Sequence, residues 1–149
     1  MHKETTVHIR PLRDTDRPAW EPLARGYRAF YRTETSDAEY QRAWERLLAN
    51  DGIRGLGAEC DGRLVGIAHY LFHTSTWAPT VCYLQDLFTE PAMRGRGVAG
   101  RLIAAVADAA RAAGAARYYW LTQDHNTTAR RLYDRVARFN GFIRYDHAL

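Results

Sequence analysis

A glycine-rich segment is the part of the sequence best suited to chemistry. It reads Arg94-Gly95-Arg96-Gly97-Val98-Ala99-Gly100. Its glycines lack the Cβ atoms that would keep a ligand away from the backbone. The segment stands where a helix is expected to begin, and the unpaired N–H groups and dipole of a helix start attract anions. With positive charge from Arg94, Arg96 and Arg101, the segment predicts a phosphate-binding loop.

Two well-known phosphate loops do not fit this segment. A Walker loop is excluded because no Gly-Lys-Ser/Thr follows the glycines. The glycine spacing differs from that of a dinucleotide fingerprint, and no strand ending in an acid arrives about 20 residues later. A glycine-rich turn among surface arginines is the alternative. The strand and helix expected on either side favour the phosphate loop over that turn.

Hydrophobic periodicity predicts the elements that position this loop. Strands are expected at 7–9, 55–60, 63–72, 80–89, 117–122 and 142–145, and helices at about 15–31, 37–49, 97–113 and 126–138. Asp61-Gly62 between two strands is a hairpin signal. The order is β-α-α-β-β-β-α-β-α-β. Meandering strands followed by βαβ units predict an α/β (mixed α+β) fold, with a mostly antiparallel sheet and helices on both faces.

Length and composition describe one globular domain. The 149 residues fit a single domain, 1–149, and 46% hydrophobic with 26% charged residues is ordinary for such a domain. No run approaches the ~18 apolar residues of a membrane span, and the polar N-terminus has no apolar signal core. Two cysteines, Cys60 and Cys82, are too few for a disulfide framework. We therefore expect a reduced, cytoplasmic protein without a metal site.

The charge is distributed unevenly along the chain. Residues 94–149 carry a net charge of +6, whereas residues 1–93 carry −2. A basic C-terminal part suits an anionic partner such as phosphate or nucleic acid. No nucleic-acid-binding motif accompanies the arginines, so nucleic acid is the less favoured partner.

Two motifs resemble the GCN5-related N-acetyltransferases. Arg94-x-x-Gly97-x-Ala99 is similar to the family's Arg/Gln-x-x-Gly-x-Gly/Ala signature, and Asn126-x-x-Ala129-x-x-Leu132-Tyr133, followed by Gly141-Phe142, is similar to its Asn…Ala…Leu-Tyr…Gly-Phe segment. The element order resembles that family over essentially the whole chain. The stretches 83–88, 119–123 and 132–137 further resemble a branch with yeast enzymes that acetylate histones, polyamines or D-amino acids.

The resemblance implies acetyl-CoA as cofactor and assigns residues to it. The loop amides would bind its pyrophosphate, Asn126 would contact its pantetheine arm, and Tyr133 would protonate the departing thiolate. For Asn126 the alternative is a helix N-cap, and for Tyr133 a core tyrosine. Backbone amides at Leu87 and Phe88 would stabilise the developing oxyanion. The expected cofactor-binding set is Leu87, Phe88, Thr89, Arg94, Gly95, Arg96, Gly97, Val98, Ala99, Gly100, Asn126 and Tyr133.

The general base is less directly indicated. Related polyamine enzymes carry a glutamate where this chain has Gln85, and an amide cannot usefully accept the amine proton. Asp86 is adjacent, but side chains alternate along a strand. If Gln85 faces the amine, Asp86 points away from it unless a bulge re-aims it. The catalytic candidates are therefore Tyr133, Asp86 and Gln85. Water and the side chains of His69, His73, Asp124 and Glu34 are the alternatives for the base.

The acceptor pocket is expected between the first two helices and a loop joining two strands. Its candidate residues are Tyr27, Phe30, Tyr31, His73, Thr76 and Trp77. The predicted function is transfer of acetyl from acetyl-CoA directly to a primary amine of a small molecule, such as an amino acid or polyamine, or of a protein. The alternatives are a non-catalytic acetyl-CoA sensor and a basic nucleic-acid-binding protein. The strand at 142–145 is open to pairing with a second copy in a homodimer.

Overall fold

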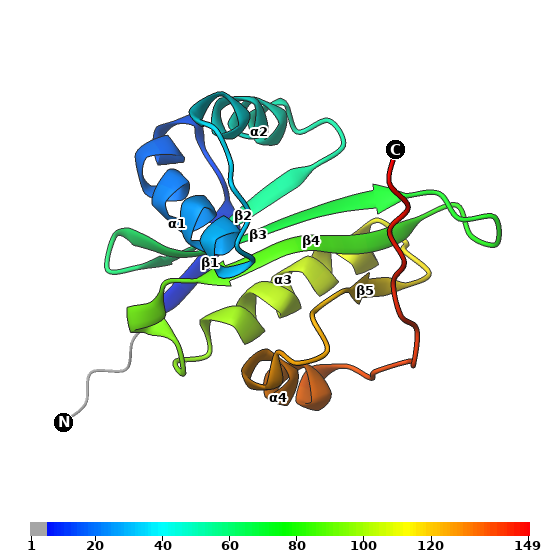
Figure 1. Cartoon of the computed structure of the whole chain (residues 1–149). Coiled ribbons are helices and arrows are strands. Elements are labelled where there is room, and N and C mark those ends of the chain that lie inside the picture. Colours follow the sequence, from blue (N-terminus) through cyan, green and yellow to red (C-terminus); the bar gives the residue numbers. More distant parts are fainter. Residues whose placement is uncertain (1–5) are drawn as a thin grey trace.

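The fold is a five-stranded sheet covered by helices on both faces (Figure 1). A computed structural model describes residues 6–149; the polar residues 1–5 lie outside it. The strands are β1 (Val7–Pro11), β2 (Arg54–Cys60), β3 (Arg63–His73), β4 (Val81–Thr89) and β5 (Tyr118–Trp120), and they lie side by side in that order. All neighbours are antiparallel except β4 and β5, which are parallel. The predicted mixed, mostly antiparallel sheet is confirmed.

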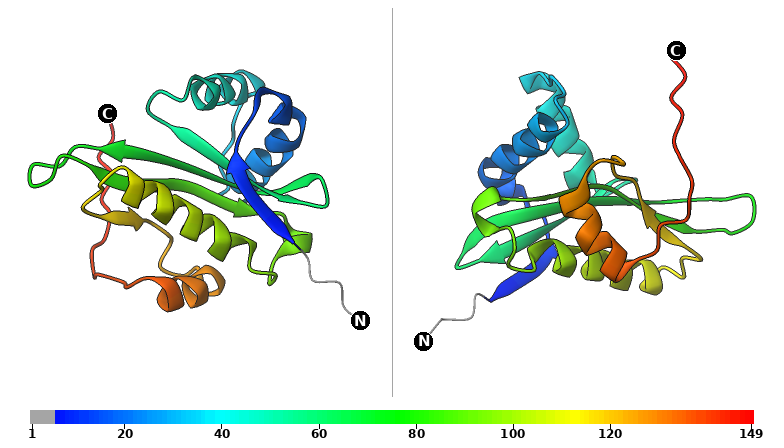
Figure 2. Two further views of the ribbon diagram at one scale, coloured as in Figure 1. Left: turned by 180° about the vertical axis from the view of Figure 1, so that it is seen from behind. Right: turned by 60° about the horizontal axis from the view of Figure 1, so that its bottom comes forward.

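The helices form two layers around this sheet (Figures 1 and 2). One face carries α1 (Arg17–Phe30), preceded by the short η1 (Asp14–Asp16), and α2 (Asp37–Ala49). The other face carries α3 (Val98–Ala112), which follows η2 (Pro91–Met93), and α4 (Thr127–Val136) lies beside the start of α3. Among residues 6–149, no helix is both long enough and apolar enough to cross a membrane.

Each face of the sheet has its own apolar core. Trp20, Leu23, Tyr40, Trp44, Leu47, Leu64 and Ile67 are buried under α1 and α2. Val65, Ala68, Cys82, Leu84, Val98, Leu102 and Val106 are buried on the α3 side. Strand alternation sends neighbouring residues to the two cores, and the 3.6-residue period of each helix supplies the covering stripe.

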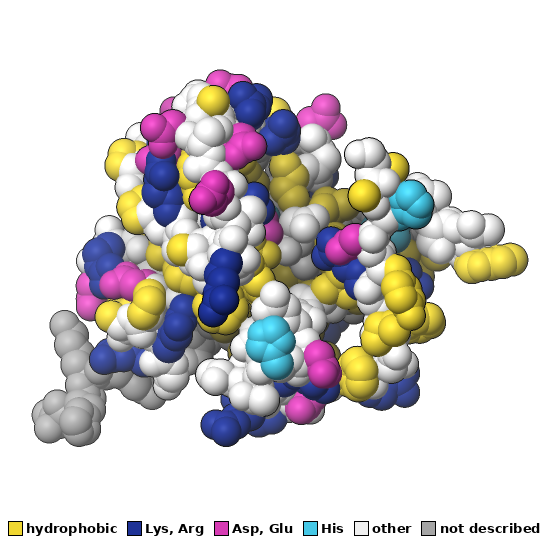
Figure 3. Space-filling model, viewed as in Figure 1, with side chains coloured by type: hydrophobic (Ala, Val, Ile, Leu, Met, Phe, Trp, Pro, Cys, Tyr) yellow, Lys and Arg dark blue, Asp and Glu magenta, His cyan; other side chains and the backbone are white. Residues whose placement is uncertain are grey.

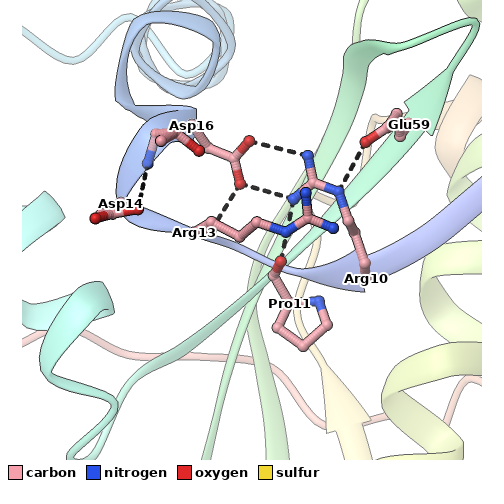
Figure 4. A network of polar contacts seen from close by, with 7 residues as sticks. Arg10, Pro11, Arg13, Asp14, Asp16 and Glu59 are labelled. Atoms are coloured by element: carbon pink, nitrogen blue, oxygen red, sulfur yellow. Dashed lines mark hydrogen bonds and ion pairs between the residues drawn. The ribbon is translucent and has the colours of Figure 1, made fainter.

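A buried ionic network fixes the start of α1 to the sheet (Figure 4). The Arg10 guanidinium donates two hydrogen bonds to Asp16, of 2.7 and 2.9 Å, and a third of 2.8 Å to Glu59. The backbone N–H of Arg13 also donates to Asp16. These hydrogen bonds, Arg10 first, hold the pKa of Asp16 below its ordinary value. Because Asp16 directly precedes α1, the network orients the helix that walls the site described below.

One extra residue in β4 changes which face its side chains occupy. In the register with β3, His69 lies opposite Asp86 while Tyr70 lies opposite Leu84, so Gln85 is a bulged residue without a partner across the strand pair. Strict alternation would place Asp86 on the α3 side with Leu84. The bulge instead places it opposite His69, on the α1 side. The bulge that would redirect Asp86 is therefore present.

The C-terminal segment differs from the sequence prediction. Residues 137–149 form no helix or strand, so the predicted strand at 142–145 is wrong for the single chain. The side chains of Phe142, Ile143 and Tyr145 are 82%, 73% and 87% exposed. A strand needs a neighbour for its backbone hydrogen bonds, and the described part of this chain provides none here. In Figure 1 the segment runs from α4 past β5.

Candidate active site

The candidate site opens where β4 and β5 diverge. Pairing between them covers only Cys82–Leu84 against Tyr118–Trp120, although β4 continues to Thr89. Past the bulge, the described chain provides no strand on that side of β4, so backbone groups there face an opening. A narrow pocket lies at this point. It is lined by Tyr27, Tyr31, Leu84, Gln85, Leu87, Trp120, Leu121 and Tyr133.

Tyr133 reaches this pocket from α4. Its ring packs against Trp120 with 5.4 Å between centroids. Burial, with a smaller contribution from Tyr31, raises the pKa of Tyr133 to about 12. A phenol with such a pKa holds its proton at neutral pH, so Tyr133 can act as a proton donor and not as a base.

Two tyrosines of α1 and one carboxylate form the opposite wall. The rings of Tyr27 and Tyr31 pack with 5.0 Å between centroids, and the Tyr27 hydroxyl donates to the Gln85 carbonyl over 3.5 Å. Burial and then the negative charge of Asp86 raise the pKa of Tyr27 above its ordinary value. Asp86 therefore lies next to the pocket wall. Aromatic faces around a carboxylate provide favourable electrostatics for a cationic amine.

Asp86 is held from behind by a buried histidine. His69 Nδ1 lies 2.8 Å from Asp86 Oδ2, and Trp20 Nε1 donates to His69 Nε2 over 3.0 Å. His69 is 6% exposed, whereas the Asp86 side chain is 26% exposed. Among the alternatives considered for the base, His69 contacts Asp86 directly. Glu34 and Asp124 are exposed and lie elsewhere in the structure.

The glycine loop has the backbone geometry of an anion site. Gly95 and Gly97 have φ angles of 77° and 80°, a left-handed conformation that glycine adopts without strain, and Gly97 caps the N-terminus of α3. A Cβ at either glycine would meet no protein atom within 4 Å. The first-turn amides of α3 have no partner within the helix. The exposed side chains of Arg94 and Arg96 lie beside them, and basic side chains gather over this part of the surface in Figure 3.

Asn126 and Thr89 lie at the start of α4 and at the end of β4. The Asn126 amide oxygen accepts from the backbone N–H of Ala129 over 3.4 Å, and its amide nitrogen donates to Thr122 over 3.2 Å. The N-cap interpretation of Asn126 is therefore correct. The buried hydroxyl of Thr89 has no hydrogen-bond partner in the described structure. An unpaired buried hydroxyl costs free energy that a ligand group can recover.

Several predicted acceptor residues lie outside the pocket lining. Trp77 is 92% exposed at the turn between β3 and β4, and His73 pairs with Val81 at that same end of the hairpin, where its Nε2 contacts the Tyr119 hydroxyl over 2.9 Å. Phe30 packs edge-on against Tyr31 but does not line the pocket. Thr76 belongs to the same distant turn. The hairpin carries His73, Thr76 and Trp77 beyond the bulge. Of the predicted set only Tyr27 and Tyr31 line the pocket.

Four contributors were not singled out from the sequence. Leu84, Trp120 and Leu121 line the pocket, and Trp20 completes the contact behind Asp86. Trp120 lies within one of the resembling stretches, which is a signal that could have identified it. Trp20 looks like an ordinary core position of a helix, and only the three-dimensional packing places its indole N–H against His69.

Neither cysteine is an activated nucleophile. Cys60 and Cys82 are both free and buried. Burial raises the pKa of the Cys82 thiol to about 11, which keeps it protonated at neutral pH. This arrangement favours direct attack by an acceptor over a covalent enzyme intermediate.

Comparisons with known proteins agree with this geometry. The family model described as "Acetyltransferase (GNAT) family" matches residues 17–139. The D-amino-acid N-acetyltransferase HPA3 of Saccharomyces cerevisiae is 30% identical over 136 residues, which are 88% of this chain and 84% of that protein. The uncharacterized N-acetyltransferase YhfO of Bacillus subtilis is 34% identical over 143 residues, covering 93% and 95%.

Solved structures share the fold. The structure of AAC(6')-Iy in complex with the bisubstrate analog CoA-S-monomethyl-acetylneamine matches with a TM-score of 0.86 at 21% identity, covering 97% of this chain and 99% of that one. Because the family match spans most of the chain and a relative is 30% identical over 88% of it, the assignment does not depend on the fold alone. The chain therefore belongs to the GNAT family of acetyltransferases and is an acetyl-CoA-dependent N-acetyltransferase, as its sequence motifs predicted.

Proposed function

We propose that this enzyme acetylates the primary amine of a small molecule, with amino acids as the first acceptor class to examine. The observation that carries the proposal is the placement of one carboxylate, Asp86, beside a narrow tyrosine-walled pocket. A positively charged amine suits a carboxylate beside aromatic side chains. The names of relatives agree, since they include a D-amino-acid N-acetyltransferase and a thialysine N-epsilon-acetyltransferase of Sus scrofa, 34% identical over 47% of this chain.

The described residues fit acetyl-CoA in three respects. The backbone amides around Gly95 and Gly97 would hold the pyrophosphate, with Arg94, Arg96 and Arg101 adding charge. The free edge of β4 at Leu87 and Phe88 and the unpaired hydroxyl of Thr89 would bind polar groups along the arm. Asn126 could present its amide there while it caps α4. When bound, acetyl-CoA supplies an activated acetyl thioester.

Asp86 and Tyr133 are proposed to move the protons. An Asp86 carboxylate oxygen binds the acceptor ammonium and accepts one proton from it, which frees the lone pair of the amine. Tyr133, protonated at neutral pH, donates its phenolic proton to the leaving sulfur. Gln85 contributes the bulge and part of the pocket lining, since its amide is not a base.

We also propose that the enzyme is a homodimer that covers its C-terminal segment. Phe139, Phe142, Ile143 and Tyr145 are 62–87% exposed along this segment, and Figure 3 shows hydrophobic side chains uncovered there. Apolar groups gathered on one surface are typical of interfaces. Phe142→Glu together with Ile143→Glu is expected to give a monomer by light scattering, whereas a wild-type monomer would refute the proposal. A single domain and a cytoplasmic location remain predictions.

The test of the function is release of CoA thiol from acetyl-CoA across an acceptor panel. The panel contains L- and D-amino acids, polyamines, aminoglycosides and lysine-containing peptides. Turnover with an amino acid supports the proposal, and turnover with peptides alone refutes the small-molecule class. If nothing reacts although acetyl-CoA binds in a titration, the non-catalytic sensor is favoured. DNA binding that weakens steeply with salt would favour a nucleic-acid function.

A further inference from the structure

We infer that His69 is a positioning residue, which orients the Asp86 carboxylate toward the acceptor amine while Trp20 holds His69 in one neutral tautomer. This inference rests on the proposed role of Asp86 as the group that meets the amine. The residues lie on three elements: Trp20 on α1, His69 on β3 and Asp86 on β4. Two hydrogen bonds join them from the core to the pocket wall: Trp20 Nε1 to His69 Nε2 over 3.0 Å, and His69 Nδ1 to Asp86 Oδ2 over 2.8 Å.

The chemistry of the indole fixes the tautomer of His69. An indole N–H can only donate a hydrogen bond, so the Nε2 atom facing Trp20 must be the acceptor and carry no proton. A neutral imidazole has one N–H, which must then be on Nδ1. Nδ1 lies 2.8 Å from Asp86 Oδ2 and donates to it. The arrangement therefore satisfies both ring nitrogens of a histidine that is 6% exposed.

This tautomer assigns His69 a role distinct from that of a base. Its only lone pair on nitrogen is occupied by Trp20, so His69 does not take the proton of the acceptor. A neutral donor orients the Asp86 carboxylate without cancelling its charge, which stays available to an ammonium group. An imidazolium in the same place would instead form an ion pair with Asp86 and compete with the acceptor.

The other ionisable groups around Asp86 are one cation and three phenols. The cation is Arg144 of the C-terminal segment, which interacts with Tyr27 and Tyr83 and is ion-paired with Asp146 over 2.8 Å. The phenols are those of Tyr27 and Tyr31 on α1 and of Tyr83 on β4, which all sense the Asp86 carboxylate. Burial is the main cause that raises the pKa of each of them above its ordinary value, so they remain neutral at working pH. The orientation of Asp86 on this face thus depends on His69 and on the bulge at Gln85.

Trp20, the buried end of this series of hydrogen bonds, is held rigidly. Trp20 is 1% exposed and packs against Trp44 with 5.0 Å between ring centroids. His69 lies within the paired part of β3, flanked in register by partners on both neighbouring strands. A donor fixed in this way limits the rotation of Asp86, which is itself only partly buried.

Two substitutions at His69 separate positioning from packing. In His69→Asn the short amide stands near the place of Nδ1 and can still donate to Asp86, but Trp20 loses its acceptor. In His69→Gln the longer amide reaches the place of Nε2 and can still accept from Trp20, but Asp86 loses its donor. We expect His69→Gln to have the higher melting temperature. We expect His69→Asn to retain kcat/KM for the amine within about three-fold, and His69→Gln to lose at least about ten-fold.

The readouts are kcat and KM for the amine, the Kd of acetyl-CoA and thermal unfolding. The inference predicts opposite rankings for stability and activity, with the Kd of acetyl-CoA unchanged in both variants. A purely structural histidine would give the same ranking for both properties. Equal activity of the two variants, or wild-type activity in His69→Gln, would overturn the inference.

Asp86→Asn distinguishes this inference from the proposed function on which it rests. The control is Asp108→Asn, which removes the same charge from an exposed residue in the C-terminal half of α3. If Asp86→Asn retains full activity, the proposed role of Asp86 fails. If Asp86→Asn is inactive while His69→Gln behaves as wild type, only the positioning role fails.

Discussion

Replacement of Gly97 by valine tests whether the glycine loop is a ligand site rather than a turn. Gly97 has a φ of 80°, and a Cβ built there meets no protein atom within 4 Å. The added Cβ therefore contacts no other part of the protein, and the expected structural cost is that of the left-handed backbone. The Cβ and methyl groups of the valine would project into the space beside the amides at the start of α3. The expected result is a folded protein that has lost most of its affinity for acetyl-CoA.

The structural cost of the change can be bounded and matched. A left-handed conformation costs a non-glycine residue roughly 1–2 kcal/mol. For a chain of this length that is a fall in melting temperature of about 2–8 °C. Gly114 offers a matched control, because its φ is 69°, it also has open space around it, and it lies at the opposite end of α3. Gly97→Val and Gly114→Val should therefore be destabilised alike.

Binding should separate the two variants. Isothermal titration with acetyl-CoA is expected to show a Kd at least about ten-fold weaker for Gly97→Val, a loss of about 1.4 kcal/mol, and an unchanged Kd for Gly114→Val. Equal affinities in two variants of equal stability would refute the reasoning, because the loop would then be a surface turn without contact to the cofactor.

Three further predictions concern the acid, the packing and the ionic network. Tyr133→Phe should lower kcat about 100-fold at an unchanged Kd for acetyl-CoA, and unchanged turnover would remove its role as acid. Gly26→Ala should destabilise the fold by about 1–3 kcal/mol in thermal unfolding, because the new Cβ would stand 2.7 Å from the ring of Phe88; a wild-type melting temperature would contradict the close approach. The pKa of Asp16 is lowered in the folded state, chiefly by Arg10, so its contribution is complete above its unfolded value near 3.9 and disappears as the pH falls through the folded value. The stability advantage of the wild type over Asp16→Asn should therefore be constant at neutral pH and shrink below about pH 4, and an advantage that persists in acid would show that the carboxylate is not its source.

Local signals were sufficient for most elements. The expected boundaries of α3 and of the hairpin around Asp61-Gly62 agree with the structure to within about two residues, because capping and turn residues mark them within the sequence itself. Residues 142–145 have strand propensity, but a strand also needs a partner, and propensity carries no information about where an edge will be. That part of the sequence was therefore misread as a strand of the single chain.

The candidate site shows the same limit in the side chains. Tyr133 and Gly97 could be proposed from the sequence because they occupy motif positions with fixed spacing. Asp86 could be named but not oriented, since its direction depends on whether β4 contains an extra residue. His73 and Trp77 were grouped with the acceptor pocket because they are aromatic and close in sequence to β4. The length of the hairpin, which no local pattern encodes, carries them away from it.

The bulge at Gln85 accounts for two features of the site together. Pairing of β4 with β5 ends at Leu84, the residue immediately before the bulge. A bulge bends its strand and increases the local twist, so the same inserted residue that turns Asp86 toward α1 also carries β4 away from β5. The opening proposed to receive a ligand and the carboxylate proposed to meet the acceptor thus have one physical origin. For this reason Gln85, which cannot act as a base, is still a determinant of the proposed site. It supplies the backbone irregularity, and Asp86, in contact with His69, would supply the charge.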